Sequence, residues 1–243
     1  MAAADRYFVD FPIQTGTITL SGQEAHHLIH VMRAKPGTKI LLFDGSGDEF
    51  SARVDEVGRT DVKLAILSRQ TVNRELPVEL TLGVALPKGD RQKWLVEKAV
   101  ELGVTRIAPL RTSRSVAQPV EQALLRLQRT VVEASKQCGR NRLMEITEPQ
   151  SWADFVAAAP AACCRLLAHP EHRSHPSHRA RALPLPAGDE PAEPILLAVG
   201  PEGGFTSEEV ALATSAGWHA VDLGPRILRI ETAAILLVAL AAR

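Results

Sequence analysis

The stretch Ile195-Leu196-Leu197-Ala198-Val199-Gly200-Pro201-Glu202-Gly203-Gly204 decides the fold of the second half of this chain. Its five apolar residues predict a strand, and the glycines that follow leave backbone without side chains, which a ligand can approach closely. Thr206 and Glu209 have the spacing of a capping box, so we expect a helix whose first amides point back toward the strand end. Open α/β sheets bind cofactors at such strand ends.

A second junction of the same kind follows at once. Gly217 is placed to end the helix, residues 219–223 predict another strand, and residues 224–229 form the next loop. Two loops of this type in one short stretch suggest a single pocket. The helix expected over residues 230–242 is apolar nearly all round, which predicts burial against more than one sheet face. It is too short to span a bilayer.

The composition is that of a soluble globular chain. It has 243 residues, of which 45% are hydrophobic and 23% charged, and this length favours two domains. Residues 1–10 lack the apolar core of a signal peptide. The three cysteines, two of them adjacent, cannot form a disulfide framework, and this fits a reducing compartment. We therefore expect a cytoplasmic protein without a membrane segment.

Residues 169–194 are rich in proline, histidine and alanine and predict an exposed loop. Four histidines recur there at every third position, namely His169, His172, His175 and His178. Prolines between them prevent a continuous helix from aligning the rings, and no cysteine or carboxylate pattern completes a ligand set. No metal is expected.

Basic residues are concentrated in one segment, although the formal net charge of the chain is zero. Residues 106–142 contain eight basic and two acidic residues, a net charge of +6 that the rest of the chain balances with −6. Such a surface can bind phosphates, or it can be a solvated helix face balanced in space by acidic neighbours. Charge alone leaves both readings open.

The first 70 or so residues predict short strands joined by turns, a small antiparallel barrel or sheet. Ser21 and Glu24 are spaced to cap a short helix that runs to Met32. The strands are expected at residues 16–20, 38–43, 49–57 and 61–67. Residues 71–77 are interpreted as a linker.

Strands alternate with helices from Val78 onward, which predicts a parallel sheet covered on both faces. Asp90 and Ser151 are expected to cap helices, and Gly103 and Gly139 to end them. The expected strands are residues 78–86, 106–110, 165–168 and 195–199, and the expected helices are residues 91–102, 119–137 and 151–158.

Six motifs occur together in one order along the chain. They are His26-His27-Leu28-Ile29-His30-Val31-Met32-Arg33, Leu42-Phe43-Asp44-Gly45, Glu101-Leu102-Gly103-Val104, Gln137-Cys138-Gly139-Arg140-Asn141-Arg142, Gly200 to Gly204, and Leu223 to Ala233. This set resembles the RsmE family, bacterial 16S ribosomal RNA uridine N3-methyltransferases of the SPOUT superfamily. The resemblance runs from about Arg6 to Ala239, and only residues 172–193 lack a clear counterpart.

The resemblance implies an α/β protein with two domains. Residues 1–72 would form a PUA-like β-barrel that helps to bind RNA, and residues 73–243 a SPOUT methyltransferase domain with a deep trefoil knot. Periodicity could not have revealed a knot, which the general rules of chain topology disfavour. The resemblance also implies a homodimer. The apolar helix at residues 230–240 is then the natural interface, although it also suits the central helix of a monomer.

S-adenosylmethionine is the implied cofactor, held by three loops of the knot. Adenine would be buried among the apolar residues of the last loop and read by backbone amides and carbonyls, although the same residues also suit ordinary core packing. The cofactor-binding residues carried over by position are Leu167, Ala168, His169, Val199, Gly200, Pro201, Glu202, Gly203, Gly204, Leu223, Gly224, Ile227, Leu228, Ile230, Thr232 and Ala233.

Methyl transfer to uridine N3 requires loss of the ring proton and alignment of nitrogen with the methyl donor. Arg229 is the candidate to stabilise the uracil anion; the alternatives are that it neutralises Glu231 or holds a phosphate. Glu202 is the candidate carboxylate near the reacting atoms, and its alternative is an acid stabilised by a helix N-terminus. A cationic neighbour that lowers the pKa of the uracil N–H would make a dedicated base unnecessary.

The RNA partner is implied to be 16S ribosomal RNA in the small subunit, with a target base that leaves its stack. Candidate contacts are Arg6, Arg33, Lys88, Arg91, Arg111, Arg114, Lys136, Arg140 and Asn141, each of which also suits a solvated surface. The main rival is a non-catalytic RNA-binding or ribosome-assembly protein. A Rossmann-type nucleotide enzyme is disfavoured, because no Gly-x-Gly-x-x-Gly follows the first strand of the α/β part.

Overall fold

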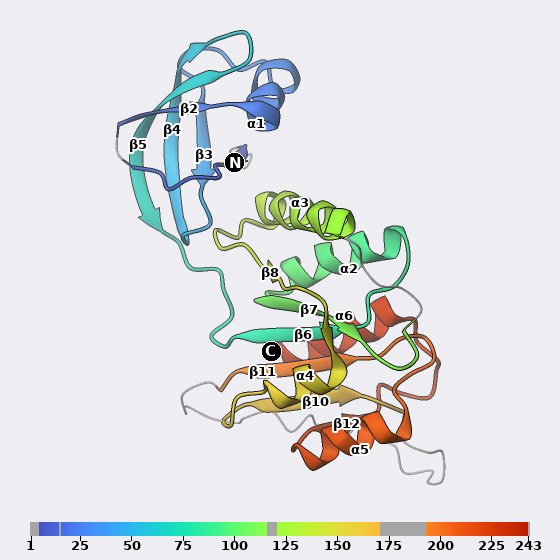
Figure 1. Ribbon diagram of the computed structural model, residues 1–243. Coiled ribbons are helices and arrows are strands. Elements are labelled where there is room, and N and C mark those ends of the chain that lie inside the picture. Colours follow the sequence, from blue (N-terminus) through green and yellow to red (C-terminus); the bar gives the residue numbers. More distant parts are fainter. Residues whose placement is uncertain (1–4, 15, 116–120, 171–192, 243) are drawn as a thin grey trace. The chain divides into compact units, whose positions relative to one another are not determined.

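A computed structural model describes the chain except for residues 1–4, 15, 116–120, 171–192 and 243. The chain divides into two compact units, Met1–Glu75 with Val132–Leu143 and Leu76–Val131 with Met144–Arg243 (Figure 1). Each unit has its own sheet. His172, His175 and His178 lie outside the described residues.

The first unit is built on a five-stranded sheet of order β1-β3-β4-β5-β2. The strands are β1 (Arg6–Phe8), β2 (Thr17–Leu20), β3 (Lys39–Phe43), β4 (Asp48–Val57) and β5 (Val62–Thr71). The antiparallel β3-β4-β5 meander confirms the sequence prediction. The predictions missed β1, which pairs in parallel with β3, and they ended β5 too early.

Alternation along β4 places its apolar residues on one face. Phe50, Ala52 and Val54 are buried, and they join Tyr7 and Leu64 in the core of this unit. Strand side chains point to opposite faces in turn, so the polar residues between them face outward. The core is therefore one-sided, as a small barrel or curved sheet requires.

The helix predicted from Ser21 to Met32 is two different pieces. It begins as α1 (Gly22–His26) and widens into the π-helix η1 (His27–Val31). Ser21 has extended backbone, but its side chain accepts no capping hydrogen bond, so that part of the prediction is wrong. The segment is followed by Arg33 in the left-handed region, with φ 51°.

The second unit contains a parallel sheet of order β12-β10-β11-β6-β7-β8, with β9 paired to β7. This confirms the prediction from alternating strands and helices. The strands are β6 (Leu80–Val84), β7 (Arg106–Arg111), β8 (Glu145–Ile146), β9 (Gln150–Ser151), β10 (Cys164–Ala168), β11 (Ile195–Val199) and β12 (His219–Val221).

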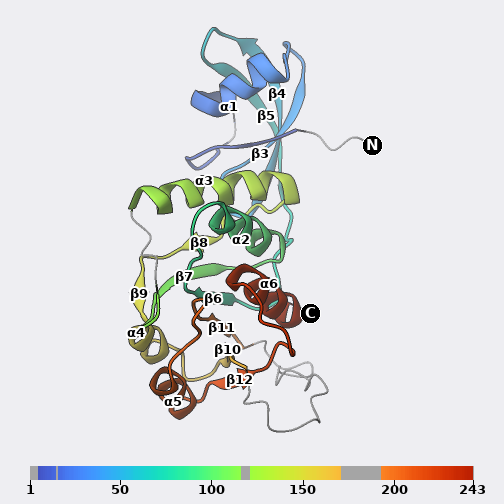
Figure 2. The ribbon, with the colours of Figure 1, turned by 90° about the vertical axis from the view of Figure 1, so that its right-hand side faces the viewer.

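Helices cover both faces of this sheet. Figure 2 shows α2 (Asp90–Glu101) and α6 (Ile230–Ala241) on one side, and α4 (Trp152–Ala157) and α5 (Ser207–Ser215) on the other. The remaining helix, α3 (Glu121–Cys138), contributes residues to both units. In the described part of the chain, no helix combines the length and apolar character needed to cross a bilayer.

Two of the four predicted N-caps, those of α4 and α5, are confirmed; Ser21 and Asp90 are not caps. Ser151 caps α4, since its hydroxyl accepts a hydrogen bond from the Asp154 amide. Thr206 and Glu209 form the predicted capping box of α5. Asp90 does not cap α2; the N-cap is Gly89, whose φ of 66° suits glycine.

Candidate active site

Three neighbouring strands deliver the predicted cofactor loops to one edge of the sheet. β10 lies between β11 and β12, and all three run parallel. The segments after Ala168, Val199 and Val221 therefore leave at the same edge. The His169 amide donates a hydrogen bond to the Val221 carbonyl at 3.1 Å, which fixes the start of the first loop beside the start of the third.

The glycine turn after β11 needs glycine for two different reasons. Gly204 closes the turn by donating its amide to the Pro201 carbonyl at 2.8 Å, and its φ is 67°. At Gly200, a Cβ atom would lie 3.0 Å from the ring of Phe205, which is itself buried. Glycine is therefore required by conformation at Gly204 and by packing at Gly200.

A cavity of about 240 Å³ lies at the carboxyl ends of the central strands. The helices after β6 and β11, α2 and α5, lie on opposite sides of the sheet (Figure 2), so this is the point where the connections diverge. The lining residues are Ala85, Leu86, Lys88, Ser115, Pro201, Glu202 and Ile230. Three of the predicted cofactor residues, Pro201, Glu202 and Ile230, thus share one cavity.

Glu209 joins the start of α5 to the loop after β7. One carboxylate oxygen accepts from the Thr206 amide at 2.8 Å, and the other accepts from the amide and hydroxyl of Ser113 at 2.8 and 3.0 Å. The Glu209 side chain is buried. The capping box was visible in the sequence, but the contact with Ser113 was not, because it joins residues 96 positions apart.

Replacing this carboxylate should loosen both segments. We expect Glu209→Gln to lower the free energy of unfolding by about 2 kcal/mol, because the amide NH2 would face donors where an oxygen accepts. Urea denaturation measures the change, with Glu208→Gln, an exposed acid in the same helical turn, as the control. Equal stability of the two variants would contradict this role.

The residues of the last loop differ widely in exposure. Leu223 and Leu228 are half-buried and Ile230 is buried, but Ile227 is 94% exposed. The expected burial of adenine among these four side chains therefore stays a prediction. Leu167 and Val199 are buried in the sheet, so their contact with a ligand also stays a prediction.

Arginines surround the glycine turn. Arg114 donates to the Gly203 carbonyl at 2.6 Å, and Arg91 lies 3.5 Å from Glu202 and 3.7 Å from Glu231. Arg229 is exposed and makes no ion pair with any residue that the structure describes. The alternative role expected for Arg229, neutralising the charge of Glu231, is therefore wrong.

The predicted RNA contacts fall into two groups. Arg33, Lys88, Arg111 and Arg114 are exposed. Arg6, Lys136, Arg140 and Asn141 are instead held inside the first unit. Lys136, for example, is 14% exposed and contacts Glu24 at 2.8 Å.

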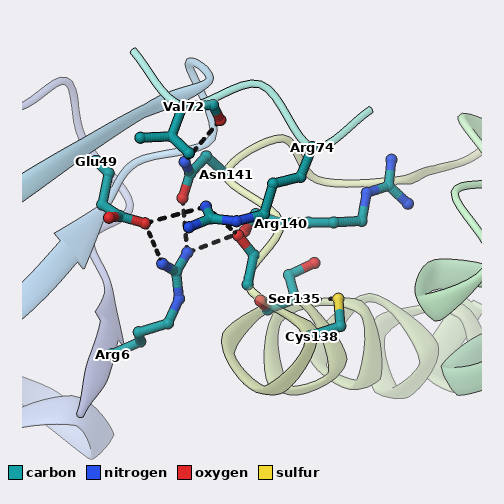
Figure 3. A network of polar contacts seen from close by, with 9 residues as sticks. Arg6, Glu49, Val72, Arg74, Ser135, Cys138, Arg140 and Asn141 are labelled. Carbon is teal, nitrogen blue, oxygen red and sulfur yellow. Dashed lines mark hydrogen bonds and ion pairs between the residues drawn. The ribbon is translucent and has the colours of Figure 1, made fainter. Parts of the chain in front are cut away.

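A polar network encloses the segment after α3 (Figure 3). Arg140 forms an ion pair with Glu75, and Asn141 accepts from Arg6 at 2.6 Å and donates to the Val72 carbonyl at 3.2 Å. Arg140 and Asn141 are only 4% and 2% exposed. Their assignment as RNA contacts is therefore corrected to an internal role. The cause is long-range pairing that no local pattern reveals.

Glu49 is the acid at the centre of this network. It pairs with Arg6 and with Arg74. Burial raises the pKa of Glu49, but the hydrogen bonds and charges of the two arginines outweigh this and hold its pKa below the ordinary 4.5. A carboxylate with a lowered folded pKa stabilises the fold fully above the unfolded pKa and loses that contribution as the pH falls through the folded value.

Acid should therefore weaken the first unit through Glu49. Between about pH 6 and about pH 3, we expect the urea midpoint of the wild type to fall more steeply than that of Glu49→Gln, which has no charge to lose. Glu56→Gln is the control, because Glu56 and its partner Lys63 are both exposed. Identical pH slopes for the wild type and Glu49→Gln would rule this contribution out.

Comparison with known proteins agrees with this geometry. A family model described as an RNA methyltransferase domain matches residues 74–242, and one described as an RNA methyltransferase PUA domain matches residues 20–67. The parallel sheet with its loops at one edge and the small N-terminal sheet thus define the class of RNA methyltransferases with a PUA domain.

Individual relatives narrow the class. Ribosomal RNA small subunit methyltransferase E of Synechocystis is 34% identical over 92% of this chain and 72% of its own length. The Bacillus subtilis protein of the same name is 30% identical over 94% and 92%. A crystal structure of the Neisseria gonorrhoeae protein, bound to S-adenosyl methionine, matches with a TM-score of 0.85 and 32% identity, covering 98% of this chain and 96% of that one.

This chain belongs to the ribosomal RNA small subunit methyltransferase E family. The resemblance inferred from the six sequence motifs is therefore confirmed. In the part of the chain that the structure describes, no group of three or more histidine, cysteine or acidic side chains is arranged to hold a metal ion.

Proposed function

We propose that the protein transfers a methyl group from S-adenosylmethionine to N3 of a uridine in 16S ribosomal RNA of the small subunit. The observation that carries this proposal is the convergence of three loops at one sheet edge, beside a cavity of about 240 Å³, in a chain of this family. The cytoplasm, where ribosomes are assembled, is the proposed location.

The residues of the site fit S-adenosylmethionine independently of the family to which the chain belongs. Pro201 and Glu202 of the glycine turn line the cavity, and Ile230 provides an apolar wall. When bound, S-adenosylmethionine supplies an electrophilic methyl group. The residues proposed to hold it are those carried over from the family, including Leu167, Ala168, His169, Leu223, Gly224, Ile227, Leu228, Thr232 and Ala233.

Arg229 is proposed to stabilise the uracil anion as the N3 proton leaves. It is exposed beside the cofactor loops without an ion-pair partner in the described residues, so its charge is available to a substrate. Positive charge placed where negative charge develops is often the largest single contribution to catalysis. Glu202 is half-exposed and lines the cavity, which makes it the proposed acceptor of the proton.

RNA binding is proposed to use the exposed cations Arg33, Lys88, Arg111 and Arg114 together with the barrel of residues 1–72. Flipping the target base out of its stack costs a few kcal/mol, which contacts to phosphates must offset. Arg91 is left out of this set, because it lies beside Glu202 and Glu231.

A deep trefoil knot in residues 73–243 and a homodimer are also proposed, on the basis of the family. Most apolar residues of α6 pack inside the second unit, but Leu236 remains 36% exposed on that helix and is available to a second copy. Light scattering tests the dimer, and tracing the chain through an experimental density map tests the knot.

Two measurements test the proposed activity. Isothermal titration should show that the intact protein binds S-adenosylmethionine. Mass mapping of 16S ribosomal RNA from a strain without this protein should reveal one uridine that lacks a methyl group. A folded protein that fails to bind at millimolar cofactor would refute the enzymatic proposal and favour a non-catalytic RNA-binding protein.

A further inference from the structure

One arginine lies between a carboxylate of the glycine turn and a carboxylate at the start of α6. Arg91, in the first turn of α2, has Nη2 at 3.5 Å from Glu202 Oε1 and Nη1 at 3.7 Å from Glu231 Oε2. Glu202 belongs to the glycine turn after β11. Glu231 is in the first turn of α6, directly after the loop that follows β12. The two ends of one guanidinium thus face the glycine turn and the first turn of α6.

We propose that Arg91 is a positioning residue that sets the glycine turn and the start of α6 in register for the cofactor. This inference rests on the proposed function, since it assumes that both segments hold S-adenosylmethionine. The sequence alone predicts for Arg91 only an RNA contact or a solvated side chain. Its two acidic neighbours, Glu202 and Glu231, indicate a positioning role instead.

The buried carboxylate fixes one end of Arg91. The Glu231 side chain is 9% exposed, and its Oε2 accepts no hydrogen bond from any described residue. A buried carboxylate is unfavourable without a nearby opposite charge. Arg91 supplies that charge from α2, a helix anchored by the buried residues Leu95, Val96, Ala99 and Val100.

The other end of Arg91 faces the more exposed carboxylate, that of Glu202. The Glu202 side chain is 52% exposed, and exposed ion pairs contribute little to stability. Glu202 nevertheless lines the cavity, so a change in its position changes the wall that a ligand meets. The planar guanidinium can face two carboxylates at once, whereas the point charge of a lysine cannot do so with the same geometry.

Calorimetric titration of the full-length protein with S-adenosylmethionine tests the proposal. We expect Arg91→Ala to raise the dissociation constant for S-adenosylmethionine roughly tenfold. An effect of this size is within the range of coupling between residues in contact. Arg91→Lys should give a smaller increase. Lys93→Ala is the matched control and should bind like the wild type, because Lys93 is exposed on the same helix and its ion pair among the described residues is with Glu97, at 3.8 Å.

A double variant separates positioning from loss of fold. Arg91→Ala leaves Glu231 buried without its counter-charge, and adding Glu231→Gln removes that charge. We expect the double variant to regain thermal stability while its dissociation constant stays raised, since Glu202 is still unrestrained. Wild-type affinity in Arg91→Ala, or in the double variant, would overturn the proposal. A wild type that binds no cofactor would instead refute the proposed function.

Discussion

Arg229→Ala is expected to reduce the methylation rate at saturating RNA and cofactor by about a hundredfold to a thousandfold, the usual effect of removing one preorganised group that stabilises developing negative charge. The residue is exposed and without an ion-pair partner in the described part of the chain, so its removal should leave the fold intact. Binding of S-adenosylmethionine should change little, because the cofactor is proposed to be held mainly by backbone.

Single-turnover methylation of undermethylated small subunits measures this effect. Arg226→Ala is the matched control, because Arg226 is exposed on the same loop. If Arg229→Ala methylates at the wild-type rate once RNA is saturating, and only RNA affinity falls, then Arg229 serves docking. The chemistry would then have to be assigned to other groups.

Gly83→Val is expected to lower the free energy of unfolding by about 3 kcal/mol, the upper end of the usual cost of overpacking a core. Gly83 in β6 pairs with Ala198 on one side and Ala108 on the other. A Cβ atom there would lie 2.6 Å from the Phe155 ring. These three small residues across adjacent strands provide the space in which Phe155 packs.

Phe155 has little freedom to move away. Its ring centroid lies 6.2 Å from that of Trp152 and 5.6 Å from that of Trp218, all within one buried cluster. Urea denaturation of Gly83→Val measures the loss. Adding Phe155→Leu should restore part of it, because the smaller side chain makes room. If Gly83→Val alone is as stable as the wild type, the packing described here is wrong.

Local patterns explain how much of the fold was predictable. Alternation of apolar runs with capping signals predicted the parallel sheet, and Thr206 with Glu209 predicted the start of α5, because these features depend on neighbours in sequence. β1 was missed since three residues are too few to show a period. The change from α1 to a π-helix has no cap or glycine to mark it.

The candidate site was predictable only where backbone decides it. Gly200 and Gly204 marked the turn, and parallel strands then had to bring the loops together. Side-chain partners distant in sequence could not be found in this way. Arg140 contacts Glu75, which is 65 positions away in the sequence, and Arg91 contacts Glu231, which is 140 positions away. The roles of Arg229 and Glu202 remain predictions.

A crystal structure of the protein with S-adenosylmethionine bound tests the proposed site most directly. We expect density for the cofactor between the turn at residues 200–204 and the segment at residues 223–233, with backbone groups of both contacting it. Cofactor bound elsewhere, with these loops contacting only solvent, would refute the proposed site.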